Sequence, residues 1–349
     1  MEILAHRLDQ VTQFFERNYG KGEYHAAALY REIFKAGNLN PFCAEEFKAS
    51  RALTLALKDR LCINPGEVVE TVEDGRLIKF ITRLSDGLKI ESVIIPMTRH
   101  RTLCVSSQVG CRMGCRFCRT AKMGLKRNLS VSEITGQVFN ARFNLGFDIK
   151  NIVFMGMGEP FDNFENVIQS IRIINEQKGF DIALRHMTLS TAGLTRGIRQ
   201  LARMKMPGIR LAVSINSARD DIRTRLMPIN RTHDLGSLKN ALQAYPLKKR
   251  GCFLFEYILI KGLNDSQKDA INLAEYIKPL PVRLNLIPYN PVCGFNYQSP
   301  DDRDMHRFSD MLTQNGIFVI KRWSKGRSVA AGCGQLGRSE SVEPVIPSA

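Results

Sequence analysis

The sequence predicts an α/β protein, in which a partial (βα)6 barrel follows a small helical and β-meander region. After about residue 98, strand-like and helix-like segments alternate six times, which is typical of parallel strands with right-handed crossovers. Before that point, apolar residues at helical spacing give way to short strands separated by Asp-Gly turns. Polar and glycine-rich segments follow the later strands, where parallel α/β folds place their ligands. The alternation alone fits both an incomplete barrel and an open doubly wound sheet.

Residues 1–97 are expected to form an N-terminal accessory domain. Apolar residues recur at helical spacing in stretches such as 25–36. Three strand-like runs follow, and the Asp74-Gly75 and Asp86-Gly87 pairs predict hairpin turns between them. These strands are expected at 67–71, 77–84 and 90–95.

Residues 98–337 are expected to form the core domain, and residues 338–349 a loose tail. The first core helix has the clearest start, because Ser130 and Glu133 have the spacing of a capping box. Core strands are expected at 102–107, 151–155, 187–189, 209–213, 252–260 and 283–287. Core helices are expected at 131–145, 164–176, 195–204, 235–244, 267–277 and 304–314.

The charge of the chain favours a polyanionic partner. Fifty Lys and Arg residues against 34 Asp and Glu give a formal net charge of +16. Such an excess favours nucleic acid, because each neutralised phosphate releases a counterion, although a basic protein kept soluble by its charge fits too. The chain has neither a run of about 18 apolar residues nor a secretory signal at its start, so we expect no membrane partner and a cytoplasmic protein.

Nine cysteines in a chain with no visible export signal argue against a disulfide framework, and the clustered ones are expected to serve metal binding or catalysis. Cys111, Cys115 and Cys118 lie in the loop after the first core strand. Three thiolates can hold three irons of a 4Fe–4S cluster and leave the fourth iron open. A zinc site completed by Cys104 is the alternative, and the six βα units favour the cluster. Small core residues are expected at Cys43, Cys62, Cys252 and Cys293.

The CxxxCxxC spacing after the first strand resembles the signature of radical-SAM enzymes. Around it, segments 101–111, 154–160, 226–230, 287–291 and 333–336 closely resemble the RlmN/Cfr group of RNA adenine methyltransferases. The resemblance runs from about residue 65 to 336. It implies a radical-SAM methyltransferase that uses one 4Fe–4S cluster and two equivalents of S-adenosyl-L-methionine (SAM) to methylate an adenine ring carbon in rRNA or tRNA. It also implies RNA contacts from the accessory domain and an electron donor such as flavodoxin or ferredoxin.

The resemblance also implies roles for three reacting side chains. Cys333 accepts a methyl group from one SAM, and a 5′-deoxyadenosyl radical from a second SAM removes a hydrogen from it. The carbon radical adds to adenine, Glu91 removes the ring proton, and Cys104 attacks Cys333 to free the product. Taken from the residues alone, Cys333 also fits a tight turn, Cys104 strand core and Glu91 a solvated carboxylate.

Contacts to SAM are likewise implied by the resemblance. Glu159 would bind the SAM amino group, although its position also suits the cap of a helix start. Without the resemblance, the other residues named below would indicate only polar strand ends. The implied contacts are Gly158, Glu159, Ser190, Ser214, Ile215, Asn216 and Asn290.

Basic residues crowd the segment that carries Cys111, Cys115 and Cys118, here called the cysteine loop (residues 111–127). This segment contains no acidic residue. Such a run is either a solvated face or a set of phosphate contacts. Nearer the end of the chain, segment 321–327 surrounds Trp323 with cations, which suits stacking on a base or a core position. The cations of the loop are Arg112, Arg116, Arg119, Lys122, Lys126 and Arg127.

Three segments depart from the family pattern, at 119–121, 161–163 and 214–216. They leave open which RNA is modified and whether carbon 2 or carbon 8 of adenine is methylated. Two alternatives also remain: a radical-SAM enzyme with a non-RNA substrate, and a zinc-stabilised RNA-binding protein.

Overall fold

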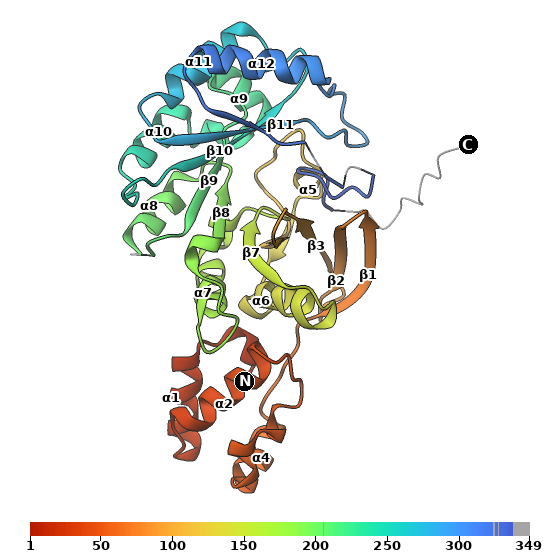
Figure 1. Ribbon diagram of the computed structural model, residues 1–349, viewed down its shortest axis with the longest axis vertical. Coiled ribbons are helices and arrows are strands. Elements are labelled where there is room, and N and C mark those ends of the chain that lie inside the picture. Colours follow the sequence, from red (N-terminus) through yellow and green to blue (C-terminus); the bar gives the residue numbers. More distant parts are fainter. Residues whose placement is uncertain (205, 324, 327, 338–349) are drawn as a thin grey trace, which may run out of the picture.

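A computed structural model of the chain describes residues 1–204, 206–323, 325–326 and 328–337 (Figure 1). Its main feature is a ten-stranded sheet in the order β1-β2-β3-β4-β7-β8-β9-β10-β11-β12. From β4 to β12 all neighbouring strands are parallel, which confirms the predicted α/β class. The strands are β1 (Glu67–Asp74), β2 (Leu77–Arg83), β3 (Lys89–Pro96), β4 (Arg101–Cys104), β7 (Ile149–Phe154), β8 (Met187–Thr191), β9 (Arg210–Ser214), β10 (Phe253–Leu259), β11 (Val282–Pro288) and β12 (Val319–Lys321).

Helices follow the parallel strands and surround the sheet in Figure 1. The predicted capping box is confirmed, since Ser130 Oγ accepts from the Glu133 N–H at 3.3 Å and Glu133 Oε2 accepts from the Ser130 N–H at 2.8 Å. The helices of the core are α5 (Arg119–Lys122), α6 (Val131–Phe139), α7 (Phe164–Asn175), α8 (Thr195–Arg203), α9 (Asp220–Leu226), α10 (Leu235–Gln243), α11 (Gln267–Ile277) and α12 (Asp302–Gln314).

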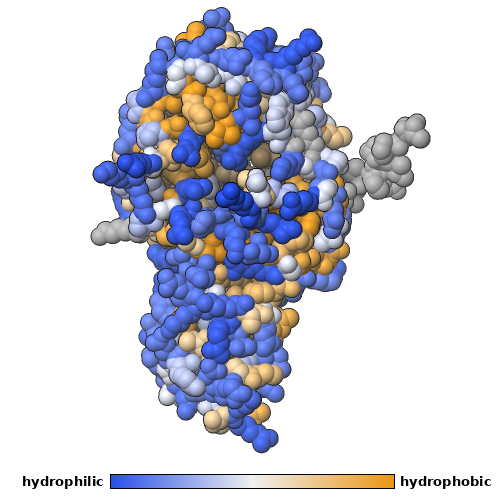
Figure 2. Space-filling model, in the orientation of Figure 1, coloured by the Kyte–Doolittle hydropathy of each residue, from blue (hydrophilic) through white to orange (hydrophobic). Residues whose placement is uncertain are grey.

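The meander is joined directly to the core sheet. Strand β3 pairs antiparallel with β4, so the sheet continues across residue 97, where the sequence predicted a domain boundary. At the other end, α1 (Leu8–Tyr19), α2 (Glu23–Phe34), α3 (Glu45–Lys48) and α4 (Arg51–Lys58) project away from the sheet (Figure 1). On the face shown in Figure 2, hydrophilic residues cover most of this projection. The division into domains stays a prediction.

Some features were not expected from the sequence. The three-residue strand β12 extends the parallel sheet, and β5 (Gln108–Gly110) pairs with β6 (Leu125–Asn128) as a separate hairpin. Elements this short carry too few residues to show a period. The predicted loose tail, residues 338–349, lies outside the described residues. Within them, no helix is long and apolar enough to span a membrane.

The expectation for the scattered cysteines was wrong. Cys43, Cys62 and Cys293 are exposed, and Cys252 is half-buried. All four lie at or beyond the ends of regular elements, where the chain runs over the surface. Residue type alone predicted that these four cysteines would be buried. Their positions at or beyond the ends of regular elements explain why they are not.

Candidate active site

Three cysteine thiols come together between β5 and α5. Cys111 directly follows β5, and Cys118 directly precedes α5. Burial raises the pKa of Cys111 to about 12. Burial also raises the pKa of Cys115 well above its usual value, and the charges of Cys118 and Cys111 add to that effect. The three side chains predicted to hold the cluster therefore lie within electrostatic reach of one another.

The surroundings of these thiols fit an iron–sulfur cluster. They pack in an apolar group that includes Phe117 and Met227. In the described part of the chain, no three Cys, His, Asp or Glu side chains are close enough to hold a single metal ion. A structural zinc needs four ligands at about 2.3 Å, whereas thiolates of a 4Fe–4S cluster each bind a different iron. Three neighbouring thiols suit three-thiolate ligation of a cluster with one open iron.

Cys104 and Cys333 lie near each other in this site. Cys104 ends β4 and is buried; burial raises its pKa to about 12, and the charge of Cys333 contributes. Residue Cys333 is exposed, yet surrounding protein still desolvates its thiol and, with the charge of Glu256, raises its pKa to about 11. The residue thus reaches solvent although many protein atoms surround its thiol. The charge of Cys118 also acts on Cys333. Cys333 therefore lies between the cysteine loop and β4.

Segment 328–337, here called the Cys333 loop, is fastened to the cysteine loop and to the end of β11. Asn290 Nδ2 donates to the Cys333 carbonyl at 3.1 Å. The Arg119 N–H donates to the Gly334 carbonyl at 2.8 Å, and Thr120 Oγ1 donates to the Leu336 carbonyl at 2.7 Å. These bonds set the position of Cys333 through backbone on both sides of it.

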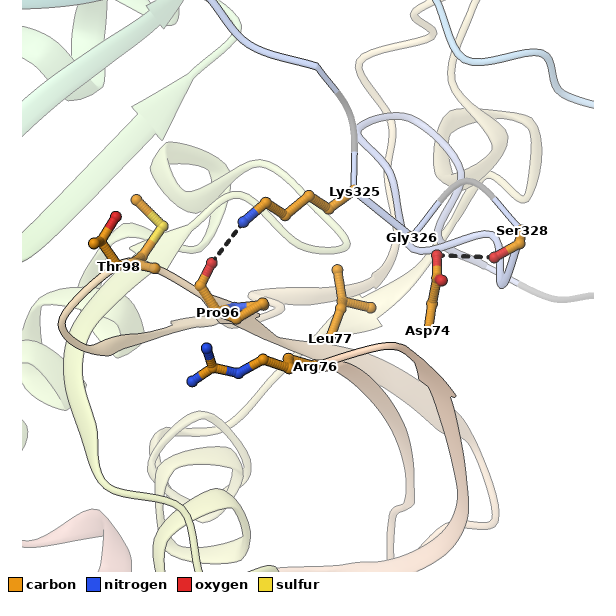
Figure 3. Close-up of a pocket in the computed structure, with 9 residues that line it drawn as sticks. Asp74, Arg76, Leu77, Pro96, Thr98, Lys325, Gly326 and Ser328 are labelled. Carbon is orange, nitrogen blue, oxygen red and sulfur yellow. Dashed lines mark hydrogen bonds between the residues drawn. The ribbon is translucent and has the colours of Figure 1, made fainter.

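Ser328, at the start of this segment, and Lys325 upstream of it are held against the meander (Figure 3). Lys325 Nζ donates to the Pro96 carbonyl at 2.8 Å, and Ser328 Oγ donates to Asp74 Oδ2 at 2.9 Å. They line an open pocket of about 730 Å³ together with Arg76, Leu77, Met97, Thr98 and Gly326. The Cys333 loop therefore bridges the meander and the cluster side of the molecule.

Glu91 lies on β3, on the same face of the sheet as Cys104. Val93 is directly opposite Cys104, and alternate residues of a strand point to one face. Glu91 is 4% exposed, and its Oε2 lies 3.6 Å from Nζ of the buried Lys79. The reading of Glu91 as a solvated carboxylate was wrong.

Gly158 and Glu159 follow β7 at the same edge of the sheet. Gly158 has φ +98°, and a Cβ there would lie 2.6 Å from the Gln108 side chain, so a larger residue does not fit. Glu159 is buried, and burial raises its pKa to about 7. Its Oε2 accepts from the Ala192 N–H at 2.7 Å and its Oε1 from the Phe161 N–H at 3.1 Å, so it also caps a helix start. The Thr191 side chain also hydrogen-bonds to this carboxylate.

The remaining predicted SAM contacts lie at neighbouring strand ends. Ser190 and Ser214 are half-buried at the ends of β8 and β9. Ile215 is fully buried, and Asn216 is buried with φ +52°. Asn216 Oδ1 accepts from the Ile258 N–H at 2.8 Å, so part of its amide serves the sheet. Asn290 follows β11 and donates to the Cys333 carbonyl, so the structure gathers these residues at one edge, and their contact with SAM stays a prediction.

Arg223 on α9 was missed by the sequence reasoning. Its side chain is fully buried, and its guanidinium donates to the carbonyls of Ala192 at 2.7 Å and Ile215 at 3.2 Å. It also donates to Asn230 Oδ1 at 2.6 Å. It thereby ties the ends of β8 and β9 together beside the site. Arginines are mostly exposed, so nothing local in the sequence signals this one.

The basic run of the cysteine loop separates into structural and exposed cations. Arg127 pairs with Asp86 at 2.7 Å and Glu133 at 2.8 Å, and Arg112 pairs with Asp162 at 2.8 Å. The side chains of Arg116, Lys122 and Lys126 are exposed. Trp323 is 46% exposed, so its reading as a core residue was wrong.

Comparisons with known proteins agree with this geometry. The Radical SAM superfamily matches residues 105–274. A "probable dual-specificity RNA methyltransferase RlmN 1" of Protochlamydia amoebophila is 40% identical over 97% of this chain and 95% of its own length. The "dual-specificity RNA methyltransferase RlmN" of Syntrophus aciditrophicus is 40% identical over 94% of both chains. The crystal structure of a radical SAM methyltransferase from Sphaerobacter thermophilus is 35% identical, with a TM-score of 0.89 over 96% of this chain and 99% of that one. The chain belongs to the RlmN family of the radical SAM superfamily.

Proposed function

We propose that this protein methylates an adenine ring carbon of ribosomal or transfer RNA, with Cys333 as the methyl carrier and Cys104 as the releasing thiol. The names of the RlmN relatives support an RNA methyltransferase. The observation that carries the proposal is the position of Cys333, whose thiol lies in electrostatic reach of Cys104 on one side and Cys118 on the other.

The proposal assigns separate groups to methyl transfer and to product release. When bound, SAM and a cluster held by Cys111, Cys115 and Cys118 supply the methyl group and the radical chemistry. Cys333 Sγ carries the methyl carbon to the base and remains bonded to it. Cys104 Sγ then attacks Cys333 Sγ as a thiolate; a sulfur–sulfur bond forms, and the bond from Cys333 Sγ to the transferred carbon breaks. The electron pair of that bond stays with the carbon, which takes a proton to become the methyl group.

Proton removal from the adenine ring is assigned to Glu91. Its carboxylate shares a face with Cys104 and lies 3.6 Å from the ammonium of Lys79. We assign the amino group of SAM to Glu159. Its buried carboxylate follows β7, at the same edge of the sheet as Ser190 and Ser214. Ser190, Ser214 and Asn290 complete the SAM contacts in this proposal.

RNA binding is assigned to the exposed cations of the cysteine loop and to the projecting helices α1–α4. Arg116 and Lys126 are exposed on the cysteine loop, and Trp323 offers a ring for base stacking. A small redox protein such as flavodoxin or ferredoxin would reduce the cluster, and the cytoplasm is the proposed place of the reaction.

The test is mass spectrometry of nucleosides from ribosomal and transfer RNA of a strain that lacks the gene, complemented with wild-type protein or Cys333→Ala. We expect wild type to restore 2-methyladenosine or 8-methyladenosine and Cys333→Ala to restore neither. The nucleoside that returns identifies the carbon, and the RNA fraction identifies the substrate. If complementation changes neither nucleoside, the proposed function is wrong.

A further inference from the structure

Ser106 joins two parts of the proposed site that come from different strands, and none of the roles above uses it. It is fully buried in the segment between β4 and β5, two residues after Cys104. Its Oγ donates to the Glu91 carbonyl at 2.7 Å and accepts from the Met157 N–H at 2.9 Å. These roles are fixed, because a carbonyl only accepts and a backbone N–H only donates. One hydroxyl therefore bonds both to β3 and to the segment after β7.

Both partners belong to groups with a proposed role. The carbonyl is that of Glu91 itself, whose carboxylate is assigned the proton of the adenine ring. Met157 lies two residues before Glu159, which is assigned the amino group of SAM. Ser106 therefore links the proposed proton acceptor to the proposed SAM site through two short hydrogen bonds.

The segment after β7 lies tightly against the segment that carries Ser106. The Gly156 N–H donates to the Val105 carbonyl at 3.0 Å, and the Gln108 N–H donates to the Met157 carbonyl at 3.2 Å. A Cβ at Gly156 would lie 2.8 Å from Ser106 Oγ, so a larger residue there would displace the hydroxyl or the backbone. Both backbone polar groups of Met157 therefore bond to the segment between β4 and β5, and the N–H does so through the Ser106 hydroxyl.

Gln137 on α6 fixes the backbone of Ser106. Its fully buried amide accepts from the Ser106 N–H at 2.8 Å and donates to the Ser106 carbonyl at 3.0 Å. Its Oε1 also accepts from Ser92 Oγ at 2.8 Å, and Ser92 is the neighbour of Glu91 on β3. The backbone that carries the Ser106 hydroxyl is therefore tied both to a helix and to the strand of Glu91.

Proton removal from the ring depends strongly on where the Glu91 carboxylate lies. A general base must come within about 2.6 to 3.2 Å of the atom whose proton it takes, and a displacement of about 1 Å can lower a rate about 10²-fold. In the proposed reaction, the ring is already bonded to the carbon on Cys333 at this step. It therefore has little freedom to follow a displaced carboxylate.

We propose that Ser106 is a positioning residue, which holds Glu91 within reach of the adenine ring proton by bonding its backbone to the segment after β7. The proton passes from the ring carbon to the Glu91 carboxylate, and the electron pair of the carbon–hydrogen bond stays in the ring. Ser106 forms and breaks no covalent bond in this step. This inference rests on the proposed role of Glu91.

The test compares Ser106→Ala with Ser170→Ala in the cluster-loaded enzyme. Ser170 is an equally buried serine on α7, where its Oγ donates to the Asn166 carbonyl at 2.7 Å within that helix. The substrate is the ribosomal or transfer RNA transcript that wild type methylates, made with hydrogen or with deuterium at carbons 2 and 8 of adenine. Turnover is counted per chain that carries a methyl group on Cys333, so that partly loaded samples remain comparable.

Ser106→Ala should lose about 10²-fold in turnover, because a misplaced base slows proton removal. Its ratio of turnover with hydrogen to turnover with deuterium should lie well above one, since proton removal then limits the rate. Methylation of Cys333 at saturating SAM does not use Glu91 and should stay near the wild-type rate, because the backbone bonds of Gly156 and Gln108 remain. Ser170→Ala should match wild type in all three measurements.

Gln137→Met provides a second variant if thermal melting shows that Ser106→Ala folds poorly. It removes the bonds to the Ser106 backbone but keeps the hydroxyl. We therefore expect a smaller loss of turnover, again with an isotope ratio above one.

The inference is overturned if Ser106→Ala keeps the wild-type turnover. It is also overturned if turnover falls with an isotope ratio of one, or if methylation of Cys333 falls by the same factor, since a merely structural role would slow both reactions. Full turnover by Glu91→Gln would instead contradict the role of Glu91 on which the inference rests. Methylation of neither transcript by wild type would contradict the proposed function itself.

Discussion

Cys104 and Cys333 approach each other from distant parts of the chain, one at the end of β4 and the other in the Cys333 loop. Charge on Cys333 adds to burial in raising the pKa of Cys104 to about 12, and both thiols are free. At neutral pH both are therefore protonated, and exchange between them waits for a step that generates a thiolate. In the proposed reaction, this arrangement would separate methyl transfer from product release in time.

The first prediction uses that separation. Cys333→Ala should neither accept a methyl group nor attach to RNA. Cys104→Ala should be methylated at Cys333 and attack the base, but it should remain attached because no thiol breaks the sulfur–carbon bond. A denaturing gel of Cys104→Ala expressed in cells should show an upshifted band that nuclease removes. Normal turnover by Cys104→Ala without such a band would reduce Cys104 to a core residue.

The second prediction concerns cluster ligation. Protein purified without oxygen should contain about four irons per chain, as one cube requires. Replacing Cys111, Cys115 or Cys118 with alanine should remove the brown chromophore, and Cys104→Ala should keep it. Iron analysis and the visible spectrum provide the measurement. A colourless wild-type protein containing zinc would contradict this assignment.

The sequence allowed the grouping of several candidate-site residues to be predicted because they lie at or after strand ends. Cys111, Glu159 and Ser214 come after strands whose patterns are visible, and parallel strands end at one edge. Arg223 could not be predicted in the same way, because its role depends on carbonyls of two other strand ends. The pairing of Arg127 could not be predicted either, because its partner Asp86 lies in a turn of the meander. Long-range contacts of this kind have no local period.

The third prediction separates binding cations from structural ones. Arg116→Glu or Lys126→Glu should weaken RNA binding and reduce the slope of log K against log salt by about 0.7 to 0.9 for each phosphate that the protein no longer neutralises. Neither change should alter the melting temperature much, because both side chains are exposed. Filter binding at several salt concentrations gives the slope. A binding constant that does not respond to salt would make this loop a solvated face.

Arg127→Glu serves as the contrast. Its guanidinium joins Asp86 to Glu133, and both partners raise its pKa. Reversing this charge should lower the melting temperature, whatever it does to RNA binding.

The fourth prediction concerns Arg223. Arg223→Met keeps most of the volume but leaves the Ala192 and Ile215 carbonyls without their donor, and Asn230 loses a bond as well. Unpaired buried acceptors cost about 1 to 3 kcal/mol each, so we expect a loss of several kcal/mol in the free energy of unfolding. Arg225→Met, on the exposed side of the same helix, should stay within about 0.5 kcal/mol of wild type. Urea unfolding of the two variants provides the comparison.

The last prediction follows from Glu159, whose pKa burial raises from 4.5 to about 7. Between these values the folded protein holds a proton that the unfolded chain has released. The contribution of Glu159 to the free energy of unfolding therefore falls as pH rises from about 4.5 to 7. Above pH 7 the buried carboxylate is ionised and its full destabilising effect is present. In the cluster-free protein, Glu159→Gln should gain stability relative to wild type across this window, by about 3 kcal/mol in total.

The same group connects pH to SAM binding. An ammonium placed against Glu159 lowers its pKa, so SAM binding near pH 6.5 should release a fraction of a proton from wild type and none from Glu159→Gln. Calorimetry in two buffers of different ionisation enthalpy measures that release, and the variant should also bind SAM more weakly. Equal proton release by both proteins would show that the SAM amino group binds elsewhere, and Glu159 would then serve only to cap the helix start after β7.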